Sequence, residues 1–310
     1  MVAEGVVFMG TPAYAVPSLR AVAAACSPVL VVTQPDRPAG RGHRLRKSPV
    51  REAAEALGLP VLTPTRLGPK TLERLRQFCP RLMVTAAYGR ILPAEYLALP
   101  ARGAYNLHAS LLPRWRGPNP IAWAIRAGDE ETGVSLMAMD TGVDTGPVVD
   151  RRAIPILSSD TTGSLGVRLS VTAAELVTDW LPRLLHEPVM PSAQPRAGSI
   201  AAKFAPEESR ILWDVAAPLV SAQIRSLLPE PAPWTLVDGE RVVIREVSAE
   251  WDADSSDRLR TGQIERRGEA WRIGCATGAV YVTLIQPAGR RAMTPGAYVR
   301  GLRREAQEAR

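Results

Sequence analysis

Short apolar runs alternate with stretches of helical pattern through the first half of the chain. The apolar runs lie at residues 6–9, 28–33, 61–62 and 82–87, and helical stretches lie at residues 13–25, 49–57 and 69–78. Runs of this length, bounded by glycine, proline or polar residues, predict buried strands. Strands that alternate with helices predict a mainly parallel, Rossmann-like α/β sheet with helices on both faces.

The pattern changes beyond this region. Apolar residues recur every three or four positions between Leu165 and Leu184, which predicts one long helix whose last turn Pro182 should kink or shorten. Residues 186–206 are rich in proline, the composition of a linker. We therefore expect a first domain over residues 1–187, a linker over 188–206 and a second domain over 207–310.

The second domain has the composition of a small β protein. A helix is expected at residues 217–228, and a hairpin should follow around Asp238-Gly239, because this pair suits the positive φ angles of a type I′ turn. Further short strands, punctuated by glycines, are expected near residues 264, 271–273 and 280–285. Short strands with glycine turns predict a small, OB-like β-barrel.

Composition narrows the class of protein. The 310 residues are 46% hydrophobic and 22% charged, the balance of a globular protein of about two domains. No apolar run is long enough to cross a bilayer, and Glu4 stands where a secretory signal would be basic. The three cysteines are widely spaced and the three histidines are far apart, so we expect neither disulfides nor a metal site, and a reducing cytoplasm.

The net charge of +7 is unevenly distributed along the chain. Residues 1–90 carry a net +8, residues 91–250 a net −5 and residues 251–310 a net +4. A solvated surface would explain either basic region alone. Two separated basic regions favour a polyanionic partner. In the second domain, a basic face is expected from seven arginines: Arg258, Arg260, Arg266, Arg267, Arg272, Arg290 and Arg291.

The densest basic cluster lies in residues 34–47, which hold only one acidic residue, Asp36. Its basic members are Arg37, Arg41, Arg44, Arg46 and Lys47. The prolines and glycines of this segment predict a solvated, mobile loop without helix or sheet. The alternative is a loop that becomes ordered on a nucleic acid.

Candidate chemistry is concentrated between residues 105 and 146. Asn106 and His108 end a strand-like segment, where alternation places both side chains on one face. An amide and an imidazole side by side at the carboxyl end of a strand can stabilise an oxyanion, although a polar strand end with a satisfied histidine explains them equally. Asp140 and Asp144 follow among glycines and threonines. They either build a tight turn or supply a carboxylate to His108.

Other chemistries are excluded by the absence of their motifs. Gly10-Thr11-Pro12 follows a strand, but the chain has neither G-x-G-x-x-G nor the lysine of a phosphate-binding loop. It also lacks G-x-S-x-G and a cysteine near a histidine, so no nucleophilic hydrolase is indicated.

Five segments together resemble a known family. They are Gly10-Thr11-Pro12, residues 33–42 (T-Q-P-D-R-P-A-G-R-G), residues 87–93 (A-Y-G-R-I-L-P), residues 106–117 (N-L-H-A-S-L-L-P-R-W-R-G) and residues 140–146 (D-T-G-V-D-T-G). The chain resembles the methionyl-tRNA formyltransferases, a branch of the 10-formyltetrahydrofolate-dependent formyltransferases, from about residue 6 to residue 292. The N-x-H, S-L-L-P and D-x-G-x-D-T-G elements belong to the superfamily, and the basic loop and second domain are typical of the tRNA branch.

The resemblance implies a formyl transfer from 10-formyltetrahydrofolate to the α-amine of initiator methionyl-tRNA, without a metal, in a cytoplasmic monomer. It implies that Asn106, His108 and Asp144 are catalytic and that Arg37, Arg41, Arg44, Arg46 and Lys47 contact the tRNA. The residues implied for folate binding are Ser110, Leu111, Leu112, Pro113, Tyr88, Gly89, Ile91, Leu92 and Val143.

Three alternatives remain at this point. Another formyltransferase of the superfamily would share the site residues but lack the basic loop. A hydrolase of 10-formyltetrahydrofolate would release formate. A non-catalytic RNA-binding protein would leave Asn106 and His108 unexplained.

Overall fold

The computed structural model describes residues 5–39, 44–253, 259–302 and 307–309, and these residues form two compact units. The first unit comprises residues 1–120, 132–154 and 166–201, and the second comprises the remaining segments. Each is described by itself.

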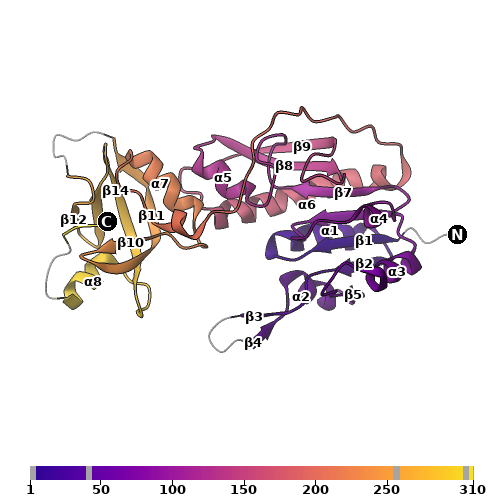
Figure 1. The fold of residues 1–310 in the computed structure, drawn as a ribbon, viewed down its shortest axis with the longest axis horizontal. Helices are drawn as coiled ribbons and strands as arrows, with labels where there is room; N and C mark the ends of the chain where they lie inside the picture. The colour runs from indigo at the N-terminus through magenta and orange to yellow at the C-terminus, as the bar shows by residue number, and fades with distance from the viewer. Residues whose placement is uncertain (1–4, 40–43, 254–258, 303–306, 310) are drawn as a thin grey trace. The chain divides into compact units, whose positions relative to one another are not determined.

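The first unit is built on one mixed sheet of seven strands (Figure 1). Five of them are parallel: β1 (Val6–Gly10), β2 (Val29–Val32), β5 (Val61–Leu62), β6 (Leu82–Ala86) and β7 (Ala104–His108). The strand β8 (Glu131–Ala138) runs antiparallel to β7, and β9 (Val148–Pro155) forms the edge beyond it. The order β5-β2-β1-β6-β7-β8-β9 confirms the Rossmann-like α/β prediction.

Helices flank this sheet. They are α1 (Val16–Ala25, preceded by a 3-10 turn at Ala13–Ala15), α2 (Pro49–Ala56), α3 (Pro69–Phe78), α4 (Ala94–Leu97) and α6 (Thr162–His186). The short helix α5 (Pro120–Arg126) falls, after its first residue, in the second unit. Successive residues Val7, Phe8 and Met9 of β1 are all fully buried, so this strand is covered on both faces. Apolar side chains of β1 pack with Leu72 and Leu75 of α3. The predicted shortening of α6 at Pro182 is wrong, because this helix continues to His186.

The basic segment contains an unexpected hairpin. Strands β3 (Arg37–Ala39) and β4 (Arg44–Arg46) pair in antiparallel register, so the prediction that residues 34–47 hold no sheet is wrong. Proline is tolerated in a two-stranded ribbon, where one side of each strand needs no ladder partner. Residues 40–43, which connect the strands, lie outside the described part of the chain.

The second unit contains an antiparallel five-stranded sheet. Its order is β10 (Trp234–Val237), β11 (Glu240–Asp252), β14 (Ala279–Pro287), β13 (Ala270–Gly274) and β12 (Ile264–Arg267). It also holds a 3-10 turn (Pro206–Ser209), α7 (Ala217–Ser226) and α8 (Pro295–Leu302). Asp238 and Gly239 have φ angles of 47° and 87°, as expected for the turn between β10 and β11.

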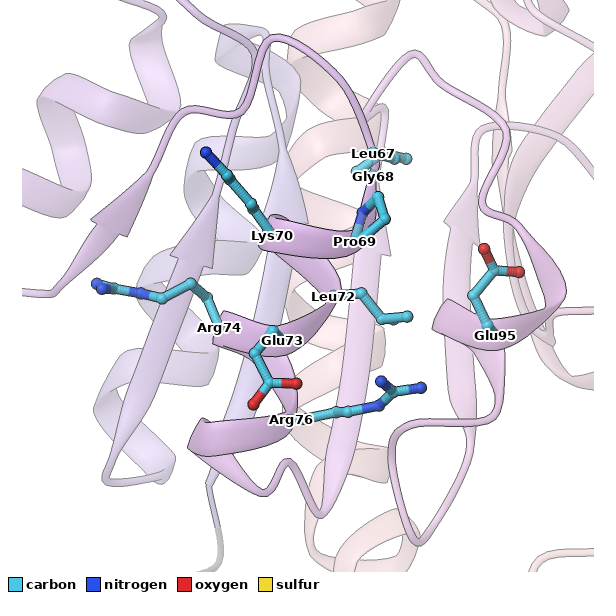
Figure 2. Close-up of a pocket in the computed structure, with 9 residues that line it drawn as sticks. All are labelled: Leu67, Gly68, Pro69, Lys70, Leu72, Glu73, Arg74, Arg76 and Glu95. Carbon is cyan, nitrogen blue, oxygen red and sulfur yellow. The ribbon is translucent and has the colours of Figure 1, made fainter.

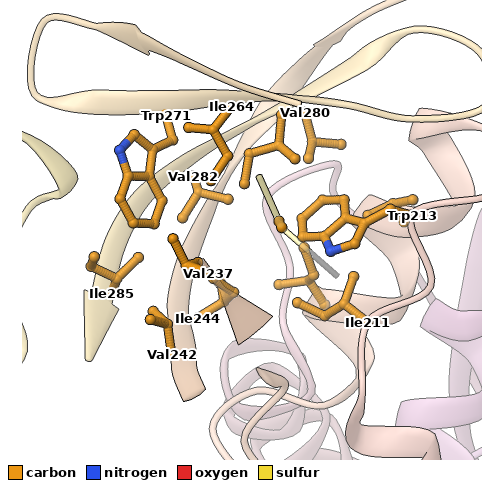
Figure 3. Packing of buried hydrophobic residues seen from close by; sticks show 14 of the residues in the cluster. Ile211, Trp213, Val237, Val242, Ile244, Ile264, Trp271, Val280, Val282 and Ile285 are labelled. Carbon is orange, nitrogen blue, oxygen red and sulfur yellow. The ribbon is translucent and has the colours of Figure 1, made fainter. Parts of the chain in front are cut away.

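The curled sheet encloses the core of the second unit and is nearly closed into a barrel. Glu308 and Ala309 bridge both edges, since Ala309 pairs with Val237 of β10 and Glu308 pairs with Gln263 beside β12. Branched aliphatic side chains from the strands and Trp213 fill the interior (Figure 3). The ring of Trp271 meets Tyr298 of α8 edge-on, with centroids 5.7 Å apart. This architecture is consistent with the predicted small barrel.

Candidate active site

The carboxyl ends of β1, β6 and β7 lie at one edge of the sheet because these strands are parallel. Hydrogen bonds connect the residues that follow these strands. The carbonyl oxygen of Tyr88 accepts a 3.0 Å hydrogen bond from the Thr11 hydroxyl and a 2.8 Å bond from Nε2 of Gln34. Ligands of open α/β sheets bind at such an edge.

Asn106 is oriented by a neighbouring strand. Thr85 of β6 lies opposite Asn106 in the parallel register, and its Oγ1 donates a 2.7 Å hydrogen bond to Oδ1 of Asn106. Thr85 is buried. The bond places the Asn106 oxygen against the protein, and its Nδ2 group is the donor left for a ligand.

His108 lies between two acceptors. Nε2 is 2.9 Å from the carbonyl oxygen of Trp115, and because a carbonyl only accepts, Nε2 carries the hydrogen in this arrangement. Nδ1 lies 3.5 Å from Oδ1 of Asp144. That distance is longer than an ordinary N–H···O bond, so a proton on Nδ1 faces the carboxylate without being held tightly by it.

The two aspartates of the D-x-G-x-D-T-G segment have different roles. Asp140 builds the turn, accepting from the backbone N–H of Gly142 at 3.0 Å and from the Thr145 hydroxyl at 2.9 Å. Asp144 instead faces His108 and accepts a 2.8 Å bond at Oδ2 from the backbone N–H of Gly117. The segment therefore holds both the tight turn, built by Asp140, and a carboxylate that faces His108, supplied by Asp144.

Only glycine fits the end of this turn. A Cβ atom at Gly146 would overlap the carbonyl oxygen of Ala138 at the end of β8. The glycine thus lets the turn approach the sheet closely, and this approach brings Asp144 toward β7.

The S-L-L-P loop is tied to the sheet by Ser135 of β8, which is fully buried. Its Oγ donates to the carbonyl of Ser110 at 2.7 Å and accepts from the backbone N–H of Leu112 at 3.0 Å. Nε of Arg151 donates to the Leu112 carbonyl at 2.7 Å. These bonds hold the loop rigidly beside His108.

The residues expected to bind folate divide by exposure. Ser110, Leu112, Tyr88 and Leu92 are buried, which leaves little of their side chains to face a ligand. Ile91 is 71% exposed and Val143 is 51% exposed, whereas Leu111 and Pro113 are half-buried and Gly89 is exposed. Within the expected set, the accessible side chains are therefore those of Ile91, Val143, Leu111 and Pro113.

The basic hairpin is anchored at its base. Arg51 of α2 donates 2.9 Å bonds to both carboxylate oxygens of Asp36, and Lys47 forms a 2.6 Å ion pair with Glu55. Arg37 donates to Oε1 of Gln34. Arg46 is exposed, Arg44 begins β4, and Arg41 lies outside the described residues.

The expected arginine face of the second unit is wrong in one respect. Arg272 is 3% exposed and donates to Asp252 at 2.6 Å and Glu265 at 3.0 Å, so it belongs to the interior. Arg267 pairs with Glu265 at 3.0 Å. Five of the other expected arginines are exposed: Arg260, Arg266, Arg267, Arg290 and Arg291. Arg258 lies outside the described residues.

A separate pocket of about 760 Å³ lies beside α3, between Leu67 and Glu95 (Figure 2). It is lined by charges of both signs and shares no residue with the site at the carboxyl edge. Within the ranges that the structure describes, three or more potential metal ligands nowhere gather around one point. No helix there is long and apolar enough to cross a membrane.

Two residues of the site were missed from the sequence. Thr85 reads as an ordinary strand residue, and only the register of β6 against β7 reveals its role. Gln194 lies in the proline-rich segment assigned to a linker, yet its side chain reaches the carbonyls of Asp144 and Gly146.

Comparison with known proteins agrees with this geometry. Residues 6–181 match the formyl transferase family and residues 203–303 match its C-terminal domain. A curated methionyl-tRNA formyltransferase of Xylella fastidiosa (strain M23) is 44% identical over 302 residues, covering 96% of this chain and 97% of that protein. One of Halorhodospira halophila is also 44% identical, with 97% of each chain covered.

The chain belongs to the methionyl-tRNA formyltransferase family. It is a formyltransferase, and its N-x-H and D-x-G-x-D-T-G elements lie together, with His108 and Asp144 3.5 Å apart.

Solved structures share the fold of this family member. An N-formyltransferase of Helicobacter canadensis, solved with folinic acid and dTDP-3-aminofucose, has a TM-score of 0.68 at 18% identity, covering 92% of this chain and 99% of that one. HypX of Aquifex aeolicus with tetrahydrofolic acid has a TM-score of 0.64 at 19% identity. The comparison covers 97% of this chain and 47% of HypX, so the chain spans about half of that protein.

Proposed function

We propose that the protein transfers the formyl group of 10-formyltetrahydrofolate to the α-amine of methionine on initiator tRNA. The observation that carries this proposal is the juxtaposition of His108 and Asp144, 3.5 Å apart, beside an Asn106 whose Nδ2 is left to donate. The names of the curated relatives support the same reaction.

The chemistry follows from these groups. The neutral amine attacks the formyl carbon, and the formyl oxygen becomes an oxyanion that Nδ2 of Asn106 and a protonated His108 stabilise. Collapse of the tetrahedral intermediate breaks the bond to N10 of the folate, which gains the proton that the amine loses. Asp144, 3.5 Å from Nδ1, orients the imidazole.

Folate is proposed to bind along the carboxyl edge, beside residues 87–93 and the S-L-L-P loop. Gly89, Ile91, Leu111, Pro113 and Val143 offer accessible surface there. The buried members of the expected set, Ser110, Leu112, Tyr88 and Leu92, support the shape of the wall. A neighbour of the same fold contains tetrahydrofolic acid, which supports a folate donor.

The tRNA is proposed to contact the β3–β4 hairpin and the exposed arginines of the second unit. Arg37, Arg41, Arg44, Arg46 and Lys47 give the hairpin its positive charge, and phosphate contacts of this kind dominate nucleic-acid affinity. We propose that the enzyme works in the cytoplasm as a monomer.

One assay tests the proposal. Purified protein is incubated with 10-formyltetrahydrofolate and methionyl initiator tRNA, and N-formylmethionine is scored against a methionyl elongator tRNA. We expect formylation of the initiator and far less of the elongator. His108→Ala and Asn106→Ala should each lower the rate by about 10²–10³ with little change in tRNA affinity. Formate release without formylated tRNA would indicate a hydrolase, and a normal rate for folded His108→Ala would refute the mechanism.

A further inference from the structure

The side chain of Gln194 uses all of its hydrogen-bonding capacity. Nε2 donates to the backbone carbonyl of Asp144 at 2.9 Å and to that of Gly146 at 2.6 Å. Oε1 accepts from Nε of Arg116 at 3.1 Å and from Nη2 of Arg116 at 2.9 Å. An amide has two donors and two acceptor sites, so this side chain is satisfied in one orientation only.

Arg116 is the second member of the arrangement. It is 7% exposed, and its other guanidinium bonds go to the carbonyls of Pro195 at 2.7 Å and Arg196 at 3.2 Å. Among the described residues it forms no ion pair with a carboxylate. A buried guanidinium held by neutral oxygens depends on each of them, because an unpaired N–H left inside the protein is costly.

Residues 192–201, defined here as the strap, are bound to the rest of the first unit at both of their ends. Ser192 and Val148 exchange two 2.8 Å backbone bonds, and Arg116 exchanges backbone bonds with Ser199 (2.9 Å) and Ala201 (2.7 Å). The strap therefore lies in a fixed position against the loop that carries Arg116. These bonds all lie within the expected linker over residues 188–206.

Two hydrogen bonds from this network hold Asp144, one at its backbone and one at its side chain. Its carbonyl accepts from Gln194, and its carboxylate accepts from the backbone N–H of Gly117, the residue that follows Arg116. Asp144 has a φ angle of 53°, in the left-handed region that non-glycine residues rarely adopt. Such a conformation persists only where its surroundings impose it.

We propose that Gln194 is a positioning residue for formyl transfer, acting from the strap to hold Asp144 at its working distance from His108. This inference rests on the proposed function, in which Asp144 orients the catalytic imidazole. Gln194 itself touches no reacting atom. The strap is thus part of the active-site scaffold as well as the connection between the two family domains.

The variant Gln194→Glu distinguishes the positioning of Asp144 from the attachment of the strap to Arg116. A carboxylate still accepts from Arg116, with added charge attraction, but it cannot donate to the carbonyls of Asp144 and Gly146. We expect Gln194→Glu to lower kcat by about tenfold to a hundredfold with KM for tRNA unchanged, since small displacements of catalytic groups have effects of this size. Gln194→Met, which loses all four bonds, should lower kcat at least as much.

A double-mutant cycle with Asp144→Asn identifies the residue through which Gln194 acts. If Gln194 acts through Asp144, adding Gln194→Glu to Asp144→Asn should change kcat by less than about twofold. The proposal would be overturned if Gln194→Glu lowered kcat by the same factor in the wild-type enzyme and in Asp144→Asn. An unchanged kcat for Gln194→Glu alone would overturn it as well. If both Gln194 variants lose the folded state by circular dichroism, Gln194 is a structural residue and the proposal also fails.

Gln223 provides a matched control. Its buried amide likewise donates to two backbone carbonyls, those of Glu208 at 3.2 Å and Arg210 at 2.8 Å, but it lies in the second unit. Gln223→Glu should lower Tm and leave kcat unchanged. A normal kcat for Asp144→Asn would instead refute the catalytic role assigned under the proposed function, which distinguishes the two failures.

Discussion

The hydroxyl of Thr85 donates a 2.7 Å hydrogen bond to Oδ1 of Asn106, and this bond fixes the orientation of the Asn106 amide, with Nδ2 turned away from Thr85. Thr85 also lies 3.4 Å from the sulfur of Met139 and is buried. Since the two residues are opposite one another in the register of β6 and β7, the sheet itself sets their alignment.

Removing this hydroxyl should impair the rate without removing a catalytic group. Thr85→Val keeps the shape but frees the Asn106 amide to rotate, and one lost hydrogen bond of about 1 kcal/mol corresponds to roughly a fivefold decrease in kcat. Thr85→Ser retains the hydroxyl and should stay near the wild-type rate. Steady-state kinetics on both variants provide the test, and equal rates for valine and serine would show that Asn106 needs no such support.

The hairpin arginines are expected to serve the tRNA and not the chemistry. Arg46→Ala, Arg44→Ala and Arg41→Leu should reduce formylation of methionyl-tRNA much more than that of a free methionine ester. Each lost phosphate contact should lower the slope of log affinity against log salt by about 1. Filter binding over a range of salt concentrations measures this slope.

Arg74 is the control for this experiment, because it is exposed on α3 and forms no ion pair among the residues described. Arg74→Ala removes the same charge from the protein without touching the hairpin. An equal loss of affinity for Arg74→Ala and Arg46→Ala would mean that only the total charge matters.

Two sets of arginines in the second unit should behave differently. Arg272→Ala leaves Asp252 and Glu265 without their buried partner, and we expect a loss of about 2 kcal/mol or more in the free energy of unfolding. Arg290→Ala combined with Arg291→Ala should weaken tRNA binding while the unfolding transition stays in place. Urea denaturation and binding measured on the same preparations distinguish the two; a stable Arg272→Ala protein would contradict the assignment.

The cysteines should differ in reactivity. Burial raises the pKa of the Cys275 thiol to about 12, so near pH 8 the reactive thiolate is essentially absent. Cys79 is exposed. In the native protein at pH 8, a thiol reagent should modify Cys79 and spare Cys275, which should react only after unfolding. Peptide mapping by mass spectrometry checks this order, and rapid modification of native Cys275 would show that its surroundings open.

The fold was largely predictable because its signals are local. Pro69–Phe78 forms the helix that its composition predicts, and Asp238-Gly239 forms the turn that its residue types require. Asn106 and His108 were expected in one strand, and both lie in β7; the sequence also allowed an aspartate near His108, and Asp144 lies 3.5 Å from it.

The features that the sequence did not predict have one physical cause in common: they depend on contacts between residues that are far apart in the sequence. Arg272 looks like one more surface arginine in the sequence. Only the sheet order brings its partners to it: Glu265 lies on the neighbouring strand β12, and Asp252 lies on β11, across β14. Gln194 is 50 residues from the carbonyl that it binds, inside a segment whose prolines suggested a free connection. The β3–β4 hairpin forms although its composition argues for an irregular loop.

The short segment of residues 307–309 has a consequence for how molecules of this protein meet one another. Its backbone bonds to Gly262 and Ile264 on one side and to Asp238 on the other, and so occupies the hydrogen-bonding groups that the sheet would otherwise leave open. An uncovered strand edge is a template for pairing with a second chain. These three residues therefore cover both strand edges, and a fusion or truncation that pulls them away should leave those edges open to pairing with a second chain.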